Sequence, residues 1–389
     1  MLVNECRKIL RDKWFLVLIF LCLFLQIMYI YFSYCSSYNA TLTKEEKNAY
    51  SVLYQKNKGD ITEEKLNFLI KENKRLEALV LDRTYSTKYN PDTYTGYIFG
   101  DYCMIHFHLY TPVKRLYEYN IKANDIAKRA QDSKSFFEKE NNTYQSKLNQ
   151  KIAENFADRS ITRFVELDGA DSILENDILV VFLIVLLCFS GIHIWIDEKE
   201  IGMTDLIQTS VIGRNKIVAT KLVAYEVICI GLVLLFAVVS LIFVNILYGG
   251  DYLSMPAYSV KKYEDTMMNC NVFTFFLVKN FLILIALSEI ILVISIISLK
   301  SNRTVVAFVK LVIVLLVLII IHSCNISSLE YLNPLTLLFN SSLFTRCDYI
   351  NFLNNPINKS FAIALIQGGI SILMYFAIMS GKRFGYDKK

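Results

Sequence analysis

The sequence contains none of the short motifs by which nucleotide-binding and hydrolytic enzymes are most often recognised. It has no G-x-x-x-x-G-K-[S/T] phosphate loop, no H-E-x-x-H and no G-x-S-x-G. Paired aspartates within an apolar run, which would suggest an intramembrane enzyme, are also lacking. We therefore do not expect the chain to be an enzyme.

Two further classes of function find little support. Lys and Arg number 41 against 36 Asp and Glu, a formal net charge of only +5, and no basic face with interleaved aromatic residues is visible. Nucleic acid is therefore not an expected partner. The nine cysteines have neither C-x-x-C spacing nor a regular framework, which argues against a zinc site and a disulfide scaffold. His106 and His108 lack a third ligand at useful spacing, so no metal or other cofactor is expected.

Long apolar runs, by contrast, are abundant. Apolar residues make up 54% of the 389 residues and the mean hydropathy is +0.37, whereas soluble domains have about 45–50% apolar residues. A membrane-spanning helix needs roughly 20 mostly apolar residues. Six segments meet this requirement: 15–35, 178–196, 223–247, 281–299, 304–321 and 360–380. The first is too long for a signal peptide and lacks a small-residue cleavage site. The predicted fold class is an α-helical polytopic membrane protein with six transmembrane helices.

The distribution of Lys and Arg predicts how these helices cross the membrane. Basic residues gather in segments 1–14 and 197–221, in the link between the fourth and fifth helices, and in the tail 381–389. The opposite short loops contain fewer. The positive-inside rule then makes both termini cytoplasmic in a multi-pass protein of the cell (plasma) membrane. Residues 36–177 and the loop 322–359, which we expect to contain short helices, lie outside.

The N-terminal residues 1–14 have an amphipathic pattern. If they are helical, the charges lie opposite one apolar face, formed by Leu2, Val3, Cys6, Ile9, Leu10 and Trp14. This pattern predicts an interfacial helix in the headgroup plane. A simple positively charged flank of the first span is the alternative.

Residues 36–177 are long enough for a domain with its own core, which we expect to be mostly helical. Thr62 is a suitable N-cap for an amphipathic helix with Leu66, Leu69 and Leu76 on its apolar face. Two or three further helices are expected between residues 112 and 164. The tyrosine-rich stretch 84–112 is interpreted as a small sheet or an ordered loop. It could bind a ligand or pack an irregular core.

Between the second and third spans lies IDEKEIGMTDLIQTSVIGRNK, which is longer than a simple connection requires. We expect a short cytoplasmic helix that starts at Glu198 and Glu200 and ends at a left-handed turn on Gly213. Its apolar face would consist of Ile201, Met203, Leu206, Ile207 and Val211. Such a helix just below the membrane is a suitable lever for a cytoplasmic partner.

The stretch FSGIHIWIDEKEIGMTDLIQTSVIGRNKIVATKL resembles the segment after the second membrane helix in ABC type-2 exporter permeases. In that family an acidic residue, a nearby glycine, and Gly-Arg before Lys-Leu recur around the coupling helix. The N-terminal helix, the six spans and LEYLNPLTLLF around Asn333 and Pro334 extend the resemblance along the chain. The large insert after the first helix departs from the common pattern, and resembles a subgroup of bacterial permeases with a large extracytoplasmic domain.

The resemblance implies the permease subunit of an ATP-binding cassette exporter, which moves a peptide, antibiotic or other amphipathic substrate out of the cell. ATP would be bound by a separate cytoplasmic ABC ATPase subunit, and a second permease chain would complete a homo- or heterodimer in the lipid bilayer. The ATPase-coupling residues would be Glu198, Glu200, Gly202, Met203, Leu206, Gly213 and Arg214. The alternative is a membrane-anchored sensor or scaffold with an extracytoplasmic ligand-binding domain.

Four ionisable residues lie within or near the predicted spans, where a charge is costly. Lys279 and Glu226 are close enough to the helix ends for their charges to reach water. Glu289 is about ten residues, or roughly 15 Å, from the cytoplasmic end of its helix. We expect an intramembrane charge pair between Glu289 and Lys310 that locks the fourth and fifth helices together. In the alternative interpretation, Glu289 lines the translocation path.

Overall fold

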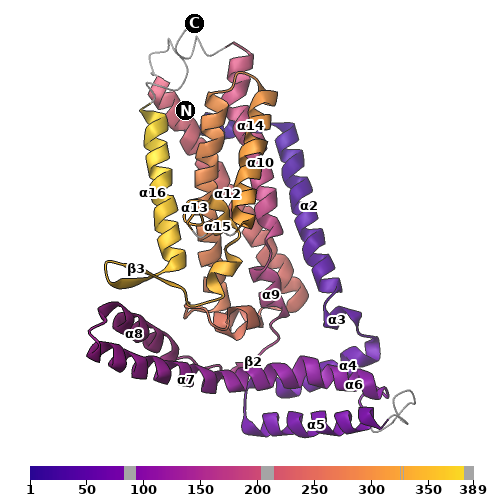
Figure 1. The fold of residues 1–389 in the computed structure, drawn as a ribbon. Coiled ribbons are helices and arrows are strands. Elements are labelled where there is room, and N and C mark those ends of the chain that lie inside the picture. Colours follow the sequence, from indigo (N-terminus) through magenta and orange to yellow (C-terminus); the bar gives the residue numbers. More distant parts are fainter. Residues whose placement is uncertain (83–92, 203–213, 325, 327, 381–389) are drawn as a thin grey trace.

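The computed structural model describes residues 1–82, 93–202, 214–324, 326 and 328–380. It consists of a bundle of long helices with a mostly helical domain at one end (Figure 1). The N-terminal helix lies at the opposite end of the bundle from this domain. We call these two ends the termini end and the domain end.

Six helices are long and apolar enough to cross a membrane, which confirms the predicted fold class. Their bounds are α2 Lys13–Cys35, α10 Ile178–Glu200, α12 Arg214–Tyr248, α13 Val272–Leu299, α14 Thr304–Ser323 and α16 Lys359–Met379. Five of them contain a whole predicted apolar segment, and α16 contains all of 360–380 except its last residue.

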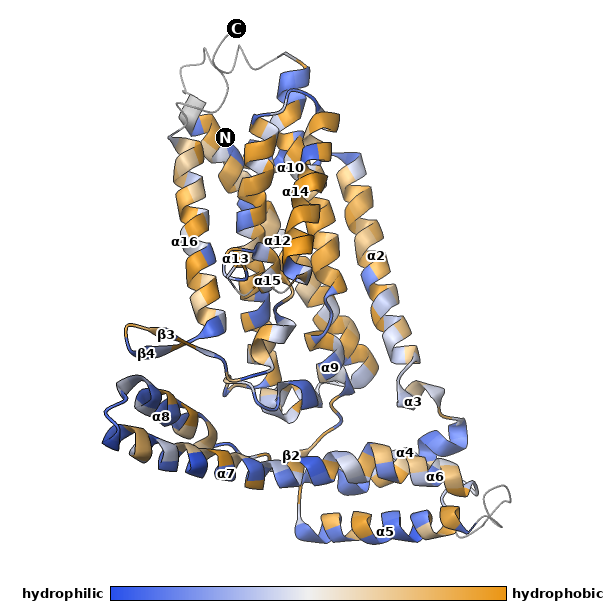
Figure 2. Ribbon diagram, viewed as in Figure 1, coloured by the Kyte–Doolittle hydropathy of each residue, from blue (hydrophilic) through white to orange (hydrophobic). Residues whose placement is uncertain are grey.

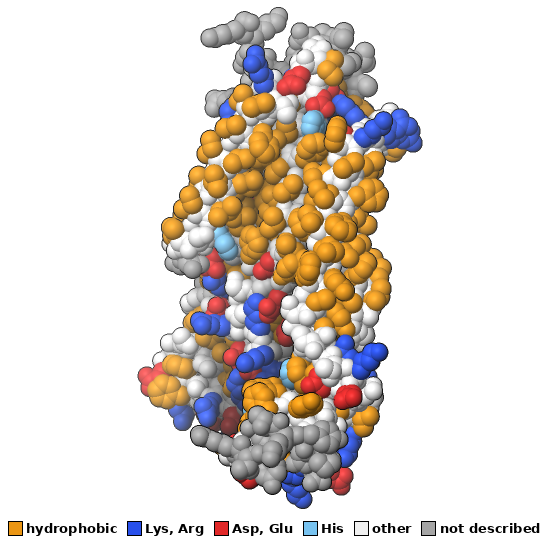
Figure 3. All heavy atoms as spheres, turned by 90° about the vertical axis from the view of Figure 1, so that its right-hand side faces the viewer, with side chains coloured by type: hydrophobic (Ala, Val, Ile, Leu, Met, Phe, Trp, Pro, Cys, Tyr) orange, Lys and Arg blue, Asp and Glu red, His pale blue; other side chains and the backbone are white. Residues whose placement is uncertain are grey.

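Helix α13 forms the centre of the bundle and packs against α10, α12, α14 and α16. Its side chains are largely buried, whereas those of α14 and α16 are mostly apolar and exposed. Figure 2 shows apolar residues along the full length of the bundle. In the view of Figure 3 they form a broad hydrophobic band, with charged side chains above it and over the domain below. This is the surface that lipid would cover.

The N-terminal helix α1, Leu2–Leu10, lies against α12 and α10 and is followed by α2 after a short turn. Asp12 caps α2 by accepting a hydrogen bond from the backbone N–H of Trp14 at 2.9 Å. The side chain of Ile9 is buried, while Leu2, Val3 and Leu10 are exposed. Residues 2–10 are therefore helical and in contact with the bundle.

The domain begins with α3 Tyr38–Thr41 and α4 Lys44–Asn57 and continues with α5 Glu63–Leu81. Its longest helix, α7 Thr111–Lys139, forms an antiparallel pair with α8 Thr143–Ala157. Two short strands, β1 Gly59–Asp60 and β2 Arg163–Phe164, pair antiparallel before α9 Asp168–Leu174 leads into the bundle. The predicted cap of α5 is confirmed, because Thr62 Oγ1 accepts a hydrogen bond from the Lys65 N–H at 3.3 Å.

The tyrosine-rich stretch differs from its prediction. Residues 83–92 lie outside the described part, but Ile98–Ile105 form α6, and His106–Tyr110 form a π-helical turn that runs directly into α7. Residues 98–112 are therefore neither a sheet nor a loop, whereas residues 93–97 form a loop, as one of the two alternatives predicted. The side chains of Ile105, Leu109, Val113 and Leu116 are buried at helical spacing, and this packing outweighs the strand propensity of tyrosine.

Two connections close the domain end of the bundle. Residues 249–271 contain the short 3-10 turns η2 Asp251–Ser254, η3 Ala257–Ser259 and η4 Lys261–Tyr263. Residues 328–358 contain α15 Pro334–Leu338, the 3-10 turn η5 Asn340–Phe344 and a hairpin, β3 Tyr349–Phe352 with β4 Asn355–Asn358. Short helices were expected in the second connection, whereas the hairpin was not.

Polar contacts fasten the domain to the first of these connections. The buried Arg159 donates to the carbonyl of Thr266 at 2.5 Å and to Asn269 Oδ1 at 2.7 Å. Lys122 forms ion pairs with Asp265 at 3.1 Å and Glu264 at 3.3 Å. Domain and bundle are thus joined by side-chain contacts as well as by the chain itself.

Candidate functional site

The candidate site lies at the termini end, where α10 leaves the bundle. The helix continues to Glu200, so Glu198 and Glu200 belong to its last turn and not to the start of a new helix, as the sequence suggested. Gly202 has a φ of +76°, and its N–H donates to the carbonyl of Lys199 at 3.1 Å. This left-handed glycine ends the helix.

Glu198 connects three helices. One carboxylate oxygen accepts a hydrogen bond from Lys8 of α1 at 2.8 Å, and the other accepts from Lys221 of α12 at 2.5 Å. Lys221 also donates to the carbonyl of Ile194 at 2.9 Å, and its side chain is only 4% exposed. A half-buried carboxylate between two lysines is favourable, whereas loss of the acid would leave the Lys221 ammonium buried without its charge partner.

The next residue, Lys199, holds the end of α13. Its ammonium donates to the carbonyls of Ser298, Leu299 and Ser301 at 3.0, 2.6 and 3.0 Å. The carbonyls at the end of a helix lack partners within the helix and carry partial negative charge, so a lysine is well suited to this position. Close by, Trp195 donates from Nε1 to Ser295 of α13 at 3.1 Å.

Glu200 holds the start of α14. It accepts hydrogen bonds from the backbone N–H and the hydroxyl of Thr304 at 2.8 and 2.9 Å. A carboxylate is favourable at a helix N-terminus, where N–H groups lack partners. Three consecutive residues of α10 thus bind α1 and α12, then α13, then α14. We call Glu198, Lys199 and Glu200 the junction.

The other four predicted coupling residues lie outside the described segments or at the edge of one. Met203, Leu206 and Gly213 lie outside the described residues, and Arg214 is the first residue of α12. Lys8, Lys199 and Thr304 were not among the predicted site residues. Their signal in the sequence was weak, because lysines beside a span are common, and neither a lysine nor a threonine reveals which helix end it binds.

The expected pair between Glu289 and Lys310 is not present. Glu289 is 5% exposed, and within the described part of the chain its Oε2 has no hydrogen-bond partner. Lys310 is exposed, and its ammonium lies 3.4 Å from the hydroxyl of Ser301 in the link between α13 and α14. A long lysine side chain this near a helix end can reach the polar boundary without an acidic partner.

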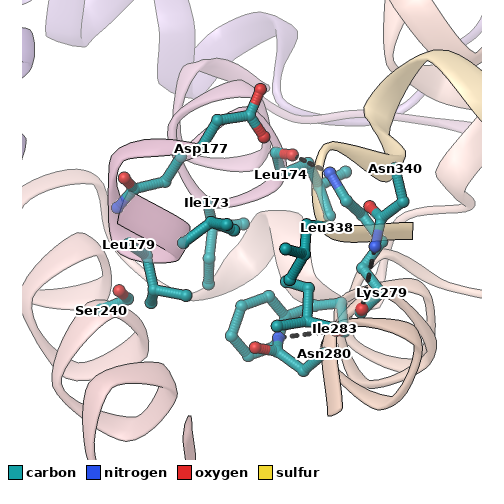
Figure 4. Close-up of a pocket in the computed structure, with 13 residues that line it drawn as sticks. Ile173, Leu174, Asp177, Leu179, Ser240, Lys279, Asn280, Ile283, Leu338 and Asn340 are labelled. Carbon is teal, nitrogen blue, oxygen red and sulfur yellow. Dashed lines mark hydrogen bonds between the residues drawn. The ribbon is translucent and has the colours of Figure 1, made fainter. Parts of the chain in front are cut away.

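Lys279 also differs from its prediction, because it is buried and does not reach water. At the domain end its ammonium donates to the carbonyl of Leu174 and, at 2.7 Å, to the Ser341 hydroxyl. Asn340 donates to the carbonyl of Lys279 at 3.0 Å. Figure 4 shows Leu174, Lys279 and Asn340 around a cavity of about 30 Å³, enough for a water molecule. The cluster joins α9, α13 and η5, and the cavity is too small for a substrate.

Residues 1–359 match the model of a family described as ABC-2 family transporter protein. No curated protein and no solved structure matches the chain. The matched region includes α1, the domain, the junction and the first five spanning helices. The chain therefore belongs to the ABC-2 transporter family, in which it is the membrane-spanning permease of an ABC transporter.

Proposed function

We propose that this permease exports an amphipathic substrate such as a peptide or an antibiotic, and that a separate ABC ATPase drives it through the junction. The observation that carries the proposal is the arrangement of Glu198, Lys199 and Glu200, whose side chains hold four different helices. The ATPase would bind and hydrolyse ATP, and a second permease chain would complete the pathway.

These contacts support a mechanism for the coupling. Residues 203–213, which connect α10 to α12 in the sequence, are the proposed docking segment for the ATPase. A displacement there would move the last turn of α10. Glu198 would pass the movement to α1 and α12, Lys199 to α13 and Glu200 to α14. Conformational coupling needs an element with two arrangements that a partner can bias, and a junction of a few polar contacts can rearrange in this way.

The charge distribution supports the proposed orientation. Lys8, Lys199, Lys221 and Arg303 all lie at the termini end, and cytoplasmic flanks of membrane helices are rich in such residues. The junction would then face the compartment in which ATP is available, and the domain would lie outside the cell.

The experiment begins with the permease purified from its native membrane together with any bound ATPase. ATP hydrolysis by the reconstituted complex is then compared with that of the ATPase alone. We expect Glu198→Gln to lower the permease-dependent part of hydrolysis several-fold. The matched control is Asp197→Asn, because this neighbouring carboxylate contacts His193 of its own helix at 3.0 Å. We expect the control to stay within about twofold of the unmodified protein.

Two results would count against the proposal. If no ABC ATPase accompanies the permease, a role as sensor or scaffold becomes the better explanation. If an ATPase is present but the Glu198 and Asp197 variants behave alike, the junction does not couple the two subunits.

A further inference from the structure

The β3–β4 hairpin has an unusual turn. Phe352 pairs with Asn355, so Leu353 and Asn354 form a two-residue turn. Both have positive φ, at 48° and 61°. Such turns favour asparagine or glycine, and a leucine is uncommon there because its Cβ is crowded in the left-handed region. The residue that the hairpin presents at its outermost point is therefore an apolar one in an unfavourable backbone conformation.

Both apolar side chains of the hairpin tip are exposed. Leu353 is 82% exposed, the highest value among the large hydrophobic residues that the structure describes, and Phe352 is 60% exposed. The tips of turns in water are generally built from polar residues and glycine. The composition of this tip is unfavourable in water and suited to an apolar environment.

The position of the hairpin indicates which apolar environment is available. Strand β4 is followed immediately by α16, whose Phe361 and Leu365 are 65% and 62% exposed. These residues belong to the surface that lipid would cover. Figure 1 shows the hairpin projecting sideways from the domain-end terminus of α16, at the level between the bundle and α8. The tip thus continues the lipid-facing surface at the height of the membrane boundary.

We propose that the tip, Phe352 and Leu353, inserts into the lipid bilayer at the domain end and anchors the hairpin in the interfacial region. The occupant of this apolar surface is the membrane itself, not a second protein. Aromatic and aliphatic side chains at the level of the headgroups are a known means of fixing a protein to a bilayer. Insertion of the tip requires neither the ATPase nor a particular direction of transport.

The anchor also reaches the domain, because α8 is bound to the hairpin by two lysines. Lys147 donates to Asn355 Oδ1 at 2.7 Å, and Lys151 donates to the carbonyl of Pro356 at 2.6 Å. A hairpin fixed in the bilayer would therefore hold α8 close to the membrane surface. The domain would have a support there in addition to its contacts with residues 249–271.

The test uses tryptophan fluorescence of the full-length permease in phosphatidylcholine vesicles that contain brominated lipid. Leu353→Trp is compared with Val52→Trp, whose site on α4 is 69% exposed and belongs to the domain, away from the bundle. Both are made with Trp14→Phe, and the signal of that parent protein is subtracted. We expect emission of Leu353→Trp at shorter wavelength, and at least twofold stronger quenching than for Val52→Trp when bromine is near the headgroups.

Equal emission and quenching at the two sites would overturn the proposal. An emission at shorter wavelength that brominated lipid does not quench, and that disappears at one permease per vesicle, would also overturn it. In that case the tip would be covered by a second copy of the chain and not by lipid.

The role of the anchor for the domain is tested by amide hydrogen exchange in the same vesicles. Phe352→Ser with Leu353→Asn should raise exchange in α8 several-fold, whereas Phe352→Leu with Leu353→Met should not. Unchanged exchange in the polar variant would refute the support of α8.

Discussion

The two ends of the helical bundle are held together in different ways. At the termini end, three consecutive side chains of α10 reach four other helices directly. At the domain end, the helices are covered by connections whose tyrosines Tyr252 and Tyr263 are fully buried, and by a domain attached through Arg159 and Lys122. Many apolar contacts resist displacement together, whereas a few polar contacts can be exchanged. The comparison suggests a rigid support at the domain end and an adjustable junction at the other.

The largest expected effect concerns the support at the domain end. Arg159 is 3% exposed, makes hydrogen bonds to Asn155, Asn269, Tyr119 and Thr266, and stacks on Phe156 and Tyr258. Arg159→Ala removes these contacts, and we expect it to destabilise the domain by about 4 kcal/mol. Amide hydrogen exchange of residues 257–270 in nanodiscs measures the loss.

The matched control is Arg163→Ala, because Arg163 is exposed on β2. It should change exchange very little. Similar effects of the two substitutions would show that the domain is not fastened through Arg159, and the contrast between the two ends would be weaker.

A smaller effect is expected at the junction. Glu198→Gln keeps the size of the side chain but removes the charge between Lys8 and Lys221. The junction should lose about 2 kcal/mol, since hydrogen bonds between charged groups are the stronger kind. Hydrogen exchange of α1 should rise while that of the domain stays constant. A rise in the domain as well would show that the two ends are not independent.

The end of α10 provides a third prediction. Gly202 has a φ of +76°, which a residue with a Cβ adopts at a cost of about 1 kcal/mol. Gly202→Ala should therefore lower the thermal stability slightly. Gly231→Ala is the control, because Gly231 lies inside α12, where alanine is the better helix former. A variant at position 202 as stable as this control would contradict the role of the left-handed glycine.

The last prediction is a pH dependence of the stability of the domain. The ring of His108 stacks on Tyr38 with centroids 3.5 Å apart, and burial lowers the pKa of His108 from its ordinary value of 6.5 to about 4. Because the folded state disfavours the protonated ring, its contribution to stability is complete above about pH 6.5 and is lost as the pH falls toward 4. Denaturation of the domain between these pH values should show the loss, and His108→Gln should flatten that part of the profile.

Some features could be predicted from the sequence because they depend on nearby residues. Six apolar segments of about 20 residues sufficed for the fold class, and Thr62 before an amphipathic stretch sufficed for the start of α5. The extent of α10 could not be predicted in this way. Its charged last turn at Glu198 and Glu200 looked like the beginning of another helix, and it remains helical because its side chains find partners on α12 and α14.

Other errors came from pairing residues by their distance along the chain. Glu289 and Lys310 are on consecutive helices, yet Lys310 lies near Ser301 and Glu289 faces the interior of the bundle. No partner was predicted for Glu198, whose partner on α1, Lys8, is 190 residues away in the sequence. The hairpin at residues 349–358 was missed because four-residue strands carry too little periodic signal to be recognised.

The sequence by itself determined that the chain crosses the membrane six times and that a large segment is inserted after the first crossing. These properties follow from the length and polarity of continuous segments. They do not depend on contacts with residues that are distant in the sequence. Only the tertiary structure decided which charges meet at the junction, which groups accept hydrogen bonds from the Lys279 ammonium, and where the hairpin tip lies. Hydrogen bonds and ion pairs depend on geometry within a few ångströms, and that geometry is fixed only when distant helices pack together.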